Sequence, residues 1–194
     1  SFCSGCCEVW QLPPAARPLR RESRDTIGAL FESALARSDG AAGAHCIHEL
    51  WMRHEPPGNI ERWLGQLWQH ASASIPEWLP MRYIEWLPLL YQVGARFQAD
   101  SGRSNIYLVL LDYSDRGSDP YGLYVGMSRY APARRFDQHK SGIRAAGSVL
   151  KRGLEVLTGP TWHLQHIARA QAADIEERLA QALRAEGLQV QGGH

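Results

Sequence analysis

Cysteine is scarce in this chain of 194 residues, and three of its four cysteines fall within the first seven positions. So few cysteines argue against the disulfide framework of a small secreted domain. A zinc site could instead be assembled from Cys3, Cys6, Cys46 and His48, because a C-x2-C pair presents two thiolates to one tetrahedral ion. The Cys-x-His half of that site has an uncommon spacing, so we favour a reduced N-terminus and one buried core cysteine.

The chain also lacks an excess of either charge. It has 21 Lys and Arg against 20 Asp and Glu, a formal net charge of +1, and 44% apolar residues. These figures argue against a nucleic-acid-binding protein that is strongly basic throughout, and against a disordered acidic tail. No uncharged apolar run approaches the roughly 18 residues of a membrane span, and no secretory signal is visible. We therefore expect a cytoplasmic protein.

Proline and glycine divide the chain into two parts of different character. Residues 1–102 are expected to form a mostly α-helical module, in which the first helix runs from an N-cap at Ser23 to a stop at Gly40. Pro88 is expected to kink or break the last helix. The further predicted helices are 44–54, 60–71 and 80–93.

Six of the seven tryptophans lie in this helical module. Clustered Trp side chains could stack single-stranded bases, which contributes about 1–3 kcal/mol per base. Trp51, Trp63 and Trp86, however, stand among Leu and Ile at helical spacing, which indicates a small helix-helix core. Because residues 1–102 hold 9 basic and 11 acidic residues, we expect a docking or dimerisation module that binds DNA poorly.

Residues 103–194 have the pattern of a compact α+β domain. Apolar segments at 106–111 and 122–126 predict two antiparallel strands joined by a long loop, and 162–167 is the best candidate for a third strand. The expected helices are 132–140, 144–152 and 170–185, the first opened by Pro132 and the last stopped by Gly187. The predicted domain is a short three-stranded antiparallel sheet flanked by helices.

The near-neutral total conceals a basic segment. Residues 129–152 contain seven basic residues and a single acidic residue, Asp137. A solvated helix face usually mixes both signs, so this segment indicates a polyanionic partner. The expected nucleic-acid-binding side chains are Arg129, Arg134, Lys140, Arg144, Lys151 and Arg152.

Four short segments of the C-terminal part resemble the signature of the GIY-YIG nucleases. Asn105-Ile106-Tyr107 is similar to the first motif and Tyr124-Val125-Gly126 to the second, each on a predicted strand. Arg135-Phe136 with His139 resembles the catalytic arginine helix, and Glu176 resembles the glutamate that completes the site. The resemblance covers about residues 104–188 and implies a metal-dependent endonuclease. The catalytic residues it implies are Tyr107, Tyr124, Arg135, His139 and Glu176.

Two positions depart from that signature. The glycine expected before Ile106 is Asn105, which tolerates unusual backbone angles and is expected to preserve the turn. The loop 112–121 between the two motifs is longer than is usual in the family. Loops accept insertions at little entropic cost, so we interpret this one as a decoration that could contact substrate.

Phosphodiester hydrolysis needs an activated water, a cation near the phosphoryl oxygens and a donor for the developing charge. Arg135 offers a planar fork of donors and shares a helix face with His139. Glu176 borders the apolar stripe of the final helix without a basic partner in that helix, whereas Glu177 faces outward. We expect Glu176 to bind one Mg²⁺ or Mn²⁺, completed by water and substrate phosphate.

The tyrosines and the histidine leave alternatives open. Tyr107 and Tyr124 are either strand aromatics of the core or the pair that orients or deprotonates the attacking water, with Tyr107 the first candidate. His139 relays a proton, binds phosphate or caps its helix.

The sequence therefore predicts a helical module, 1–102, followed by an endonuclease domain, 103–194, that hydrolyses DNA phosphodiester bonds with one strand per active site. It does not distinguish single-stranded from double-stranded DNA. The alternative is a non-catalytic nucleic-acid-binding module that uses the basic segment 129–152 while the tyrosines pack. A pure binder has no chemical need of Glu176, which favours the enzyme.

Overall fold

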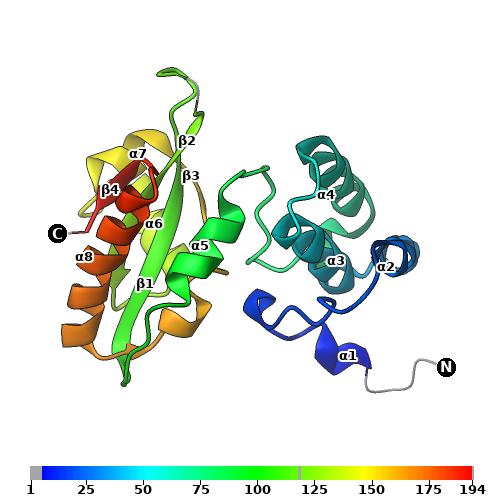
Figure 1. Ribbon diagram of the computed structural model, residues 1–194. Helices are drawn as coiled ribbons and strands as arrows, with labels where there is room; N and C mark the ends of the chain where they lie inside the picture. Colours follow the sequence, from blue (N-terminus) through cyan, green and yellow to red (C-terminus); the bar gives the residue numbers. More distant parts are fainter. Residues whose placement is uncertain (1–5, 118, 194) are drawn as a thin grey trace. The chain divides into compact units, whose positions relative to one another are not determined.

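The computed structural model describes residues 6–117 and 119–193, and the chain divides into two compact units, one up to Pro88 and one from Leu89 onward (Figure 1). This division lies N-terminal to the expected boundary between 102 and 103. The segment that follows helix α5 (Leu87–Gly94) is tied to the second unit, because Nε2 of His163 lies 2.9 Å from the carbonyl oxygen of Gly94 and 3.1 Å from that of Phe97.

The N-terminal unit is helical, as the sequence predicts. Ser23 caps α2, because its Oγ accepts a hydrogen bond from the Thr26 N–H at 3.0 Å. Gly40, expected to stop this helix, instead begins α3, whose N-cap is Asp39. A Cβ at position 40 would collide with the backbone of Ser74, so the close approach of the two segments requires a glycine. The elements of this unit are α1 (Cys6–Val9), η1 (Pro14–Ala16), α2 (Arg24–Ala36), α3 (Gly40–Met52), α4 (Pro57–Ala71) and η2 (Ser72–Ser74).

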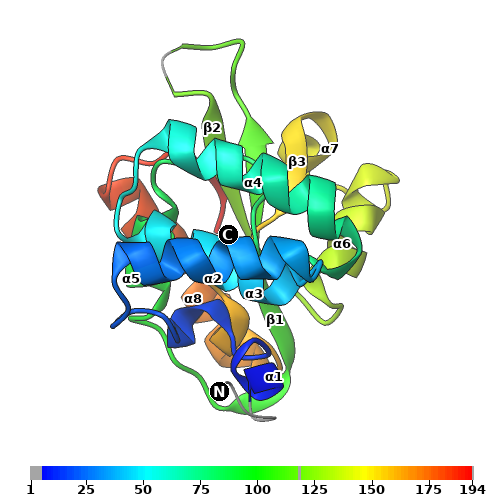
Figure 2. The same cartoon turned by 90° about the vertical axis from the view of Figure 1, so that its right-hand side faces the viewer.

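Helices α2, α3 and α4 pack against one another (Figure 2), and tryptophan side chains contribute to the core of this unit. Trp63 stacks on Phe31 with ring centroids 4.1 Å apart, and the buried Trp51 donates from Nε1 to the carbonyl of Ile84 at 2.9 Å. Trp86 is partly buried, and Trp68 is 58% exposed. The prediction of a helix-helix core is therefore confirmed for Trp51 and Trp63.

The alternative zinc site falls partly outside the structure. Cys3 and the side chain of Cys6 lie outside the described residues. Cys46 is fully buried in α3, and burial raises the pKa of its thiol to about 12, which opposes the thiolate that zinc requires. The interpretation of Cys46 as a buried core cysteine is confirmed.

The last predicted helix, 80–93, begins later than expected. Helix α5 starts at Leu87, so that Pro88 occupies its first turn and neither kinks nor breaks it. A first-turn proline needs no N–H and has the φ angle of a helix, which makes it a start signal.

The C-terminal unit contains a four-stranded mixed sheet in the order β3-β1-β2-β4. Strand β1 (Ser101–Asp112) pairs antiparallel with β2 (Tyr121–Ser128) and with β3 (Gly153–Val156), while β4 (Val190–Gly192) runs parallel to β2. The α+β class is confirmed. The prediction of three antiparallel strands is wrong, because β3 and β4 are too short to show an apolar alternation of their own.

The third strand was expected at 162–167, where the chain instead forms the 3₁₀ turn η3 (Trp162–Leu164). Ile167 makes only isolated bridges, to Ser101 and Ser104. The predicted helix 144–152 is shorter than expected, because α7 begins at Gly147.

Helices cover both faces of the sheet. Tyr107, Val109 and Leu111 of β1 pack on the side of α6 (Pro132–Lys140) and α7 (Gly147–Arg152). Helix α8 (Arg169–Ala185), stopped near Gly187 at φ +90°, lies on the opposite face (Figure 1). Within the described part of the chain, no helix combines the length and apolar character of a membrane span.

Candidate active site

Two tyrosines stand on one face of the central strands. Tyr107 lies opposite Gly126 in the β1–β2 register, and Tyr124 lies opposite Val109, so the two side chains are diagonal neighbours with ring centroids 5.9 Å apart. A Cβ on Gly126 would lie 2.5 Å from Oη of Tyr107 and 2.8 Å from the ring of Tyr124. The glycine of the second motif therefore makes the space in which the two rings meet.

His139 completes this cluster from α6. Its Nδ1 accepts a hydrogen bond from the Ala146 N–H at 2.9 Å, so the proton of the neutral ring is on Nε2. That Nε2–H donates to Oη of Tyr107, at 2.9 Å. Burial, followed by the nearby Arg135 charge, lowers the pKa of His139 to about 4, which keeps the ring neutral. The structure thus places His139 as a hydrogen-bond donor to Tyr107.

Tyr107 is 2% exposed, and this burial raises the pKa of its hydroxyl. The neighbouring Tyr124 raises the pKa further. The Arg135 guanidinium opposes this shift. Burial likewise raises the pKa of Tyr124. Both phenols are therefore protonated at neutral pH unless further positive charge enters the site.

Arg135 holds the loop that follows α6. Its guanidinium donates to the carbonyl of Ile143 at 3.2 Å, to that of Arg144 at 2.8 Å and to Oε1 of Gln138 at 3.2 Å. Arg144 adopts a left-handed backbone conformation, φ +45°, which is uncommon for a residue with a Cβ. The guanidinium group of Arg135 therefore holds the loop that carries Arg144, and its charge also acts on the Tyr107 hydroxyl.

Glu176 reaches the site from α8. It is 9% exposed, whereas Glu177 is exposed and accepts a hydrogen bond from Gln181, so the predicted phase of this helix is correct. Strand β4 pairs with β2 only as far as Val125. Two residues further along β2, the N–H of Met127 donates to the Glu176 carboxylate. Burial raises the pKa of Glu176 to about 6. Among the described residues no cation pairs with this carboxylate.

Glu176 offers one oxygen ligand of the kind that a hard divalent cation prefers. No group of three His, Cys, Asp or Glu side chains converges anywhere in the described ranges, 6–117 and 119–193. Glu176 is nevertheless a buried carboxylate with one backbone donor and no positive partner, and such a group is stabilised by a nearby cation. Mg²⁺ keeps several waters and needs only one or two carboxylates when phosphate oxygens complete its shell. Glu176 is the residue that would hold it.

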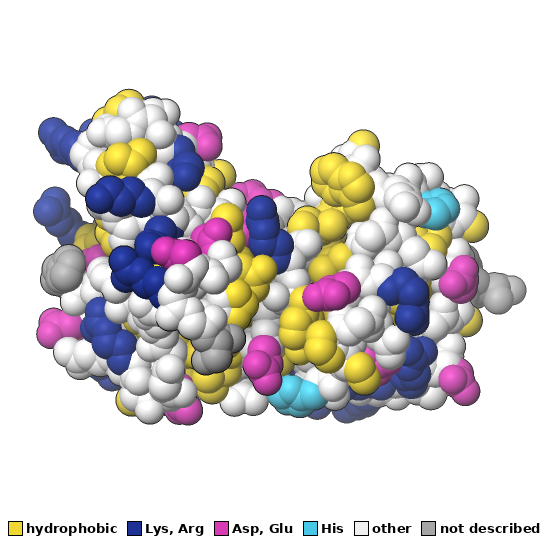
Figure 3. Space-filling view, turned by 90° about the horizontal axis from the view of Figure 1, so that it is seen from above, with side chains coloured by type: hydrophobic (Ala, Val, Ile, Leu, Met, Phe, Trp, Pro, Cys, Tyr) yellow, Lys and Arg dark blue, Asp and Glu magenta, His cyan; other side chains and the backbone are white. Residues whose placement is uncertain are grey.

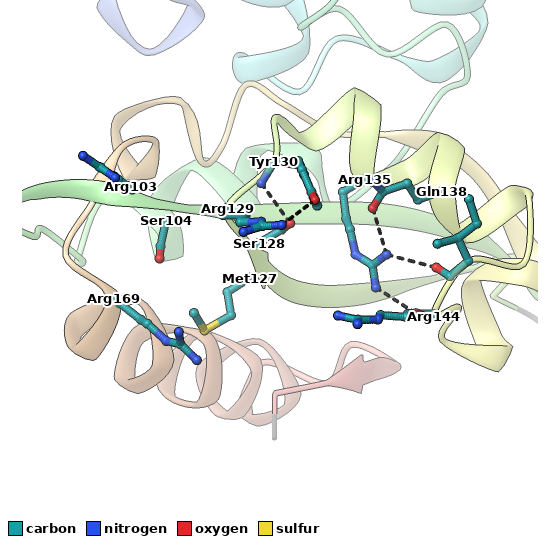
Figure 4. A pocket seen from close by; sticks show the side chains of 11 residues that line it. Arg103, Ser104, Met127, Ser128, Arg129, Tyr130, Arg135, Gln138, Arg144 and Arg169 are labelled. Atoms are coloured by element: carbon teal, nitrogen blue, oxygen red, sulfur yellow. Dashed lines mark hydrogen bonds between the residues drawn. The ribbon is translucent and has the colours of Figure 1, made fainter.

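Arg135 also lines a cavity of about 800 Å³, whereas Tyr107, Tyr124, His139 and Glu176 are not among the lining residues (Figure 4). Its lining includes no Asp or Glu and is rich in arginine and hydroxyl groups. The lining residues are Arg103, Ser104, Met127, Ser128, Arg129, Tyr130, Arg135, Gln138, Ile143, Arg144 and Arg169. Five of these residues are arginines, whose guanidinium groups are planar, permanently charged donors of the kind that bind phosphate oxygens.

The structure divides the predicted nucleic-acid-binding residues into two groups. Arg129 and Arg144 line the cavity, and Arg134 lies 4.5 Å from the ring centroid of Tyr130 beside it. Lys140 instead donates to the carbonyls of Leu150 and Gly153, and Arg152 pairs with Asp115 at 2.7 Å.

Arg152 and Lys140 thus join elements of the unit, and the structure does not bring them to the cavity. Lys151 is exposed on α7. Lys and Arg side chains are spread over the C-terminal unit on the face that Figure 3 shows.

Sequence reasoning missed Arg103 and Arg169. They stand far apart in the chain, at the beginning of β1 and at the first residue of α8, and neither belongs to a basic run. The bridges of Ile167 to Ser101 and Ser104 bring these two starts together. A sequence analysis that placed Ile167 beside the start of β1 would have predicted that Arg103 and Arg169 lie close together.

Asn105 does not shape a turn, contrary to expectation. It lies inside β1 without a positive φ, and its side-chain amide joins three segments. Nδ2 donates to the carbonyls of Ser128 and Tyr130, and Oδ1 accepts from the His166 N–H at 2.9 Å. A glycine could not make these bonds, so Asn105 adds a link between the motif strand and the cavity rim.

Comparison of the chain with protein-family models, with curated proteins and with solved structures finds no match. The arrangement of side chains is therefore the basis for a functional assignment.

Proposed function

We propose that the chain is a metal-dependent endonuclease of the GIY-YIG type that hydrolyses DNA phosphodiester bonds, one strand per active site. The observation that supports it best is the cluster of Tyr107, Tyr124 and His139, whose Tyr124 also feels the charge of Glu176. Arg135 links this cluster to the arginine-rich cavity, because it acts on Tyr107 and also lines the cavity. Each task of phosphodiester hydrolysis has a side chain within this cluster.

In the proposed mechanism, Tyr107 first gives its phenolic proton to solvent water. The resulting phenolate, stabilised by the hydrogen bond from His139 Nε2–H and by the charge of Arg135, then orients the attacking water and takes one of its protons. Arg135 and Arg144 hold the phosphate whose bond to the leaving oxygen breaks, and their positive charge stabilises the transition state. A divalent ion held by Glu176 would supply further positive charge for the phosphoryl oxygens.

The reaction is tested directly with the purified chain. It is incubated with single-stranded, duplex and flapped DNA in Mg²⁺, in Mn²⁺ and with a chelator, and the products are separated on denaturing gels. We expect cleavage of at least one substrate with metal and none with chelator. Intact DNA under every condition would instead support the alternative, a nucleic-acid-binding module.

That alternative has its own support in the arginines of the cavity, which would grip a phosphate backbone without any reaction. Glu176 argues against it. A buried carboxylate destabilises the folded chain and repels phosphate, and a module that only binds DNA gains nothing from it.

A further inference from the structure

Arg103 and Arg169 lie outside the four segments that resemble the nuclease signature, yet both line the cavity. Both side chains belong to exposed residues, and among the described residues neither makes a hydrogen bond or an ion pair. In the same unit, Arg152 pairs with the Asp115 carboxylate and Arg184 donates to the Gly192 carbonyl. Arg103 and Arg169 therefore have donors available for a ligand.

The cavity has two positively charged ends. In Figure 4, Arg103 and Arg169 lie at one end and Arg135 and Arg144 at the other, with Ser128 between them. The volume of about 800 Å³ lies within the range of pockets that enclose a ligand. A cavity of this size with cationic groups at both ends can accept a short segment of one strand, with a phosphate at each end.

The lining offers little with which to read bases. The ring of Tyr130 is already covered by the guanidinium groups of Arg129 and Arg134, with carbon-to-centroid distances of 5.0 and 4.5 Å. Oε1 of Gln138 accepts a hydrogen bond from Arg135, and no carboxylate is present in the lining. The remaining groups are mostly cationic donors, which suit phosphate rather than base edges.

We propose that Arg103 and Arg169 form a second phosphate subsite, which binds the phosphate next to the one that is cleaved and so recognises a DNA strand by its backbone, independently of sequence. This inference rests on the proposed nuclease function. It assigns the cleaved phosphate to Arg135 and Arg144 and the neighbouring phosphate to the other end of the cavity.

The test measures DNA binding in the full chain with Glu176→Gln, so that the probe stays intact. Anisotropy of a labelled single-stranded oligonucleotide is recorded over a range of salt concentrations for Arg103→Ala, Arg169→Ala and the double variant. We expect each substitution to weaken binding about tenfold and to reduce the salt slope by about 0.7, equally for mixed-sequence, oligo-dT and abasic probes. Arg178→Ala, exposed on the same helix α8, is the matched control and should leave the slope unchanged.

Three results would overturn the subsite. The slope could stay unchanged in the double variant, the loss could be confined to one base sequence, or Arg178→Ala could weaken binding as much as Arg169→Ala. Arg169→Lys, which keeps the charge, should restore most of the slope and so excludes misfolding as the cause.

A cleavage assay in Mg²⁺ on the chain that retains Glu176 separates this inference from the proposed function. If that chain cleaves DNA and the arginine variants keep the same salt slope of binding, the subsite is rejected and the nuclease is kept. A reduced slope without cleavage by any form keeps the phosphate subsite and rejects the nuclease. If both hold, the double variant should raise KM far more than it lowers kcat.

Discussion

At the scale of single residues, Glu176 and Glu177 are adjacent carboxylates with opposite environments. Glu176 is buried against β2, and Glu177 is exposed. If Glu176 anchors a divalent ion, Glu176→Gln keeps the shape of the side chain but removes its charge. Cleavage should then fall by about 10²–10³, the range for loss of one electrostatic contact in a transition state, while DNA binding persists.

Glu177→Gln is the control and should leave the cleavage rate within a few-fold. Both variants are assayed as rates of strand scission in Mg²⁺, alongside binding by anisotropy. An active Glu176 variant together with an inactive Glu177 variant would show that the site glutamate is misassigned.

The same carboxylate makes stability depend on pH. Burial raises the pKa of Glu176 from 4.5 to about 6, so the folded chain binds this proton more tightly than the unfolded chain does. The contribution is fully present below pH 4.5 and is lost as the pH rises through about 6. Glu176→Gln should therefore raise the free energy of unfolding by about 2 kcal/mol near pH 8 and change it little near pH 4.

Urea denaturation of both forms at the two pH values measures this difference. Addition of Mg²⁺ near pH 8 should stabilise the wild-type chain and not the variant, because only the carboxylate binds the ion. An equal effect of the substitution at both pH values would contradict the raised pKa.

At the scale of elements, strand β2 provides the space in which the tyrosines meet. Gly126→Ala places a methyl group against Tyr107 and Tyr124, so at least one ring must move. Overpacking of this kind costs about 1–3 kcal/mol of stability, and displacement of Tyr107 from His139 should lower the cleavage rate as well.

Gly147→Ala is the matched control, because a Cβ at the start of α7 meets nothing within 4 Å. It should be neutral or slightly stabilising, since alanine favours the helix. Thermal melts and cleavage rates of the two variants test the contrast. A Gly126→Ala protein with unaltered stability and activity would mean that the two rings are not held together.

At the scale of the whole molecule, the two units differ in the groups they offer to DNA. The arginine-lined cavity belongs to the second unit, and tryptophans of the first contribute to its own core. We expect a fragment of residues 1–102 to bind single-stranded oligonucleotides poorly in an anisotropy titration at moderate salt, because its net charge is negative.

Micromolar or tighter binding would contradict this expectation. Trp68, which is 58% exposed, would then be the first stacking platform to test, by Trp68→Ala. Trp51→Ala is unsuitable for that purpose, because its loss would open the core.

The sequence by itself determined the elements whose signals are local. The helix over Pro132–Lys140 follows from its opening proline, and the burial of Glu176 rather than Glu177 follows from the 3.6-residue period of α8. The two longest strands likewise show continuous apolar runs. These features depend on neighbours within a few residues, which a sequence displays directly.

Only the tertiary structure decided where β3 and β4 lie, what Asn105 does and which arginines share the cavity. Three-residue and four-residue strands have too few side chains to show a period, and they are held by pairing with β1 and β2. Arg103 and Arg169 come together because Ile167 bridges to β1, whereas Lys140 and Arg152 are drawn away by their own partners. Such contacts join segments distant in the chain, and a charge pattern records no distance in space.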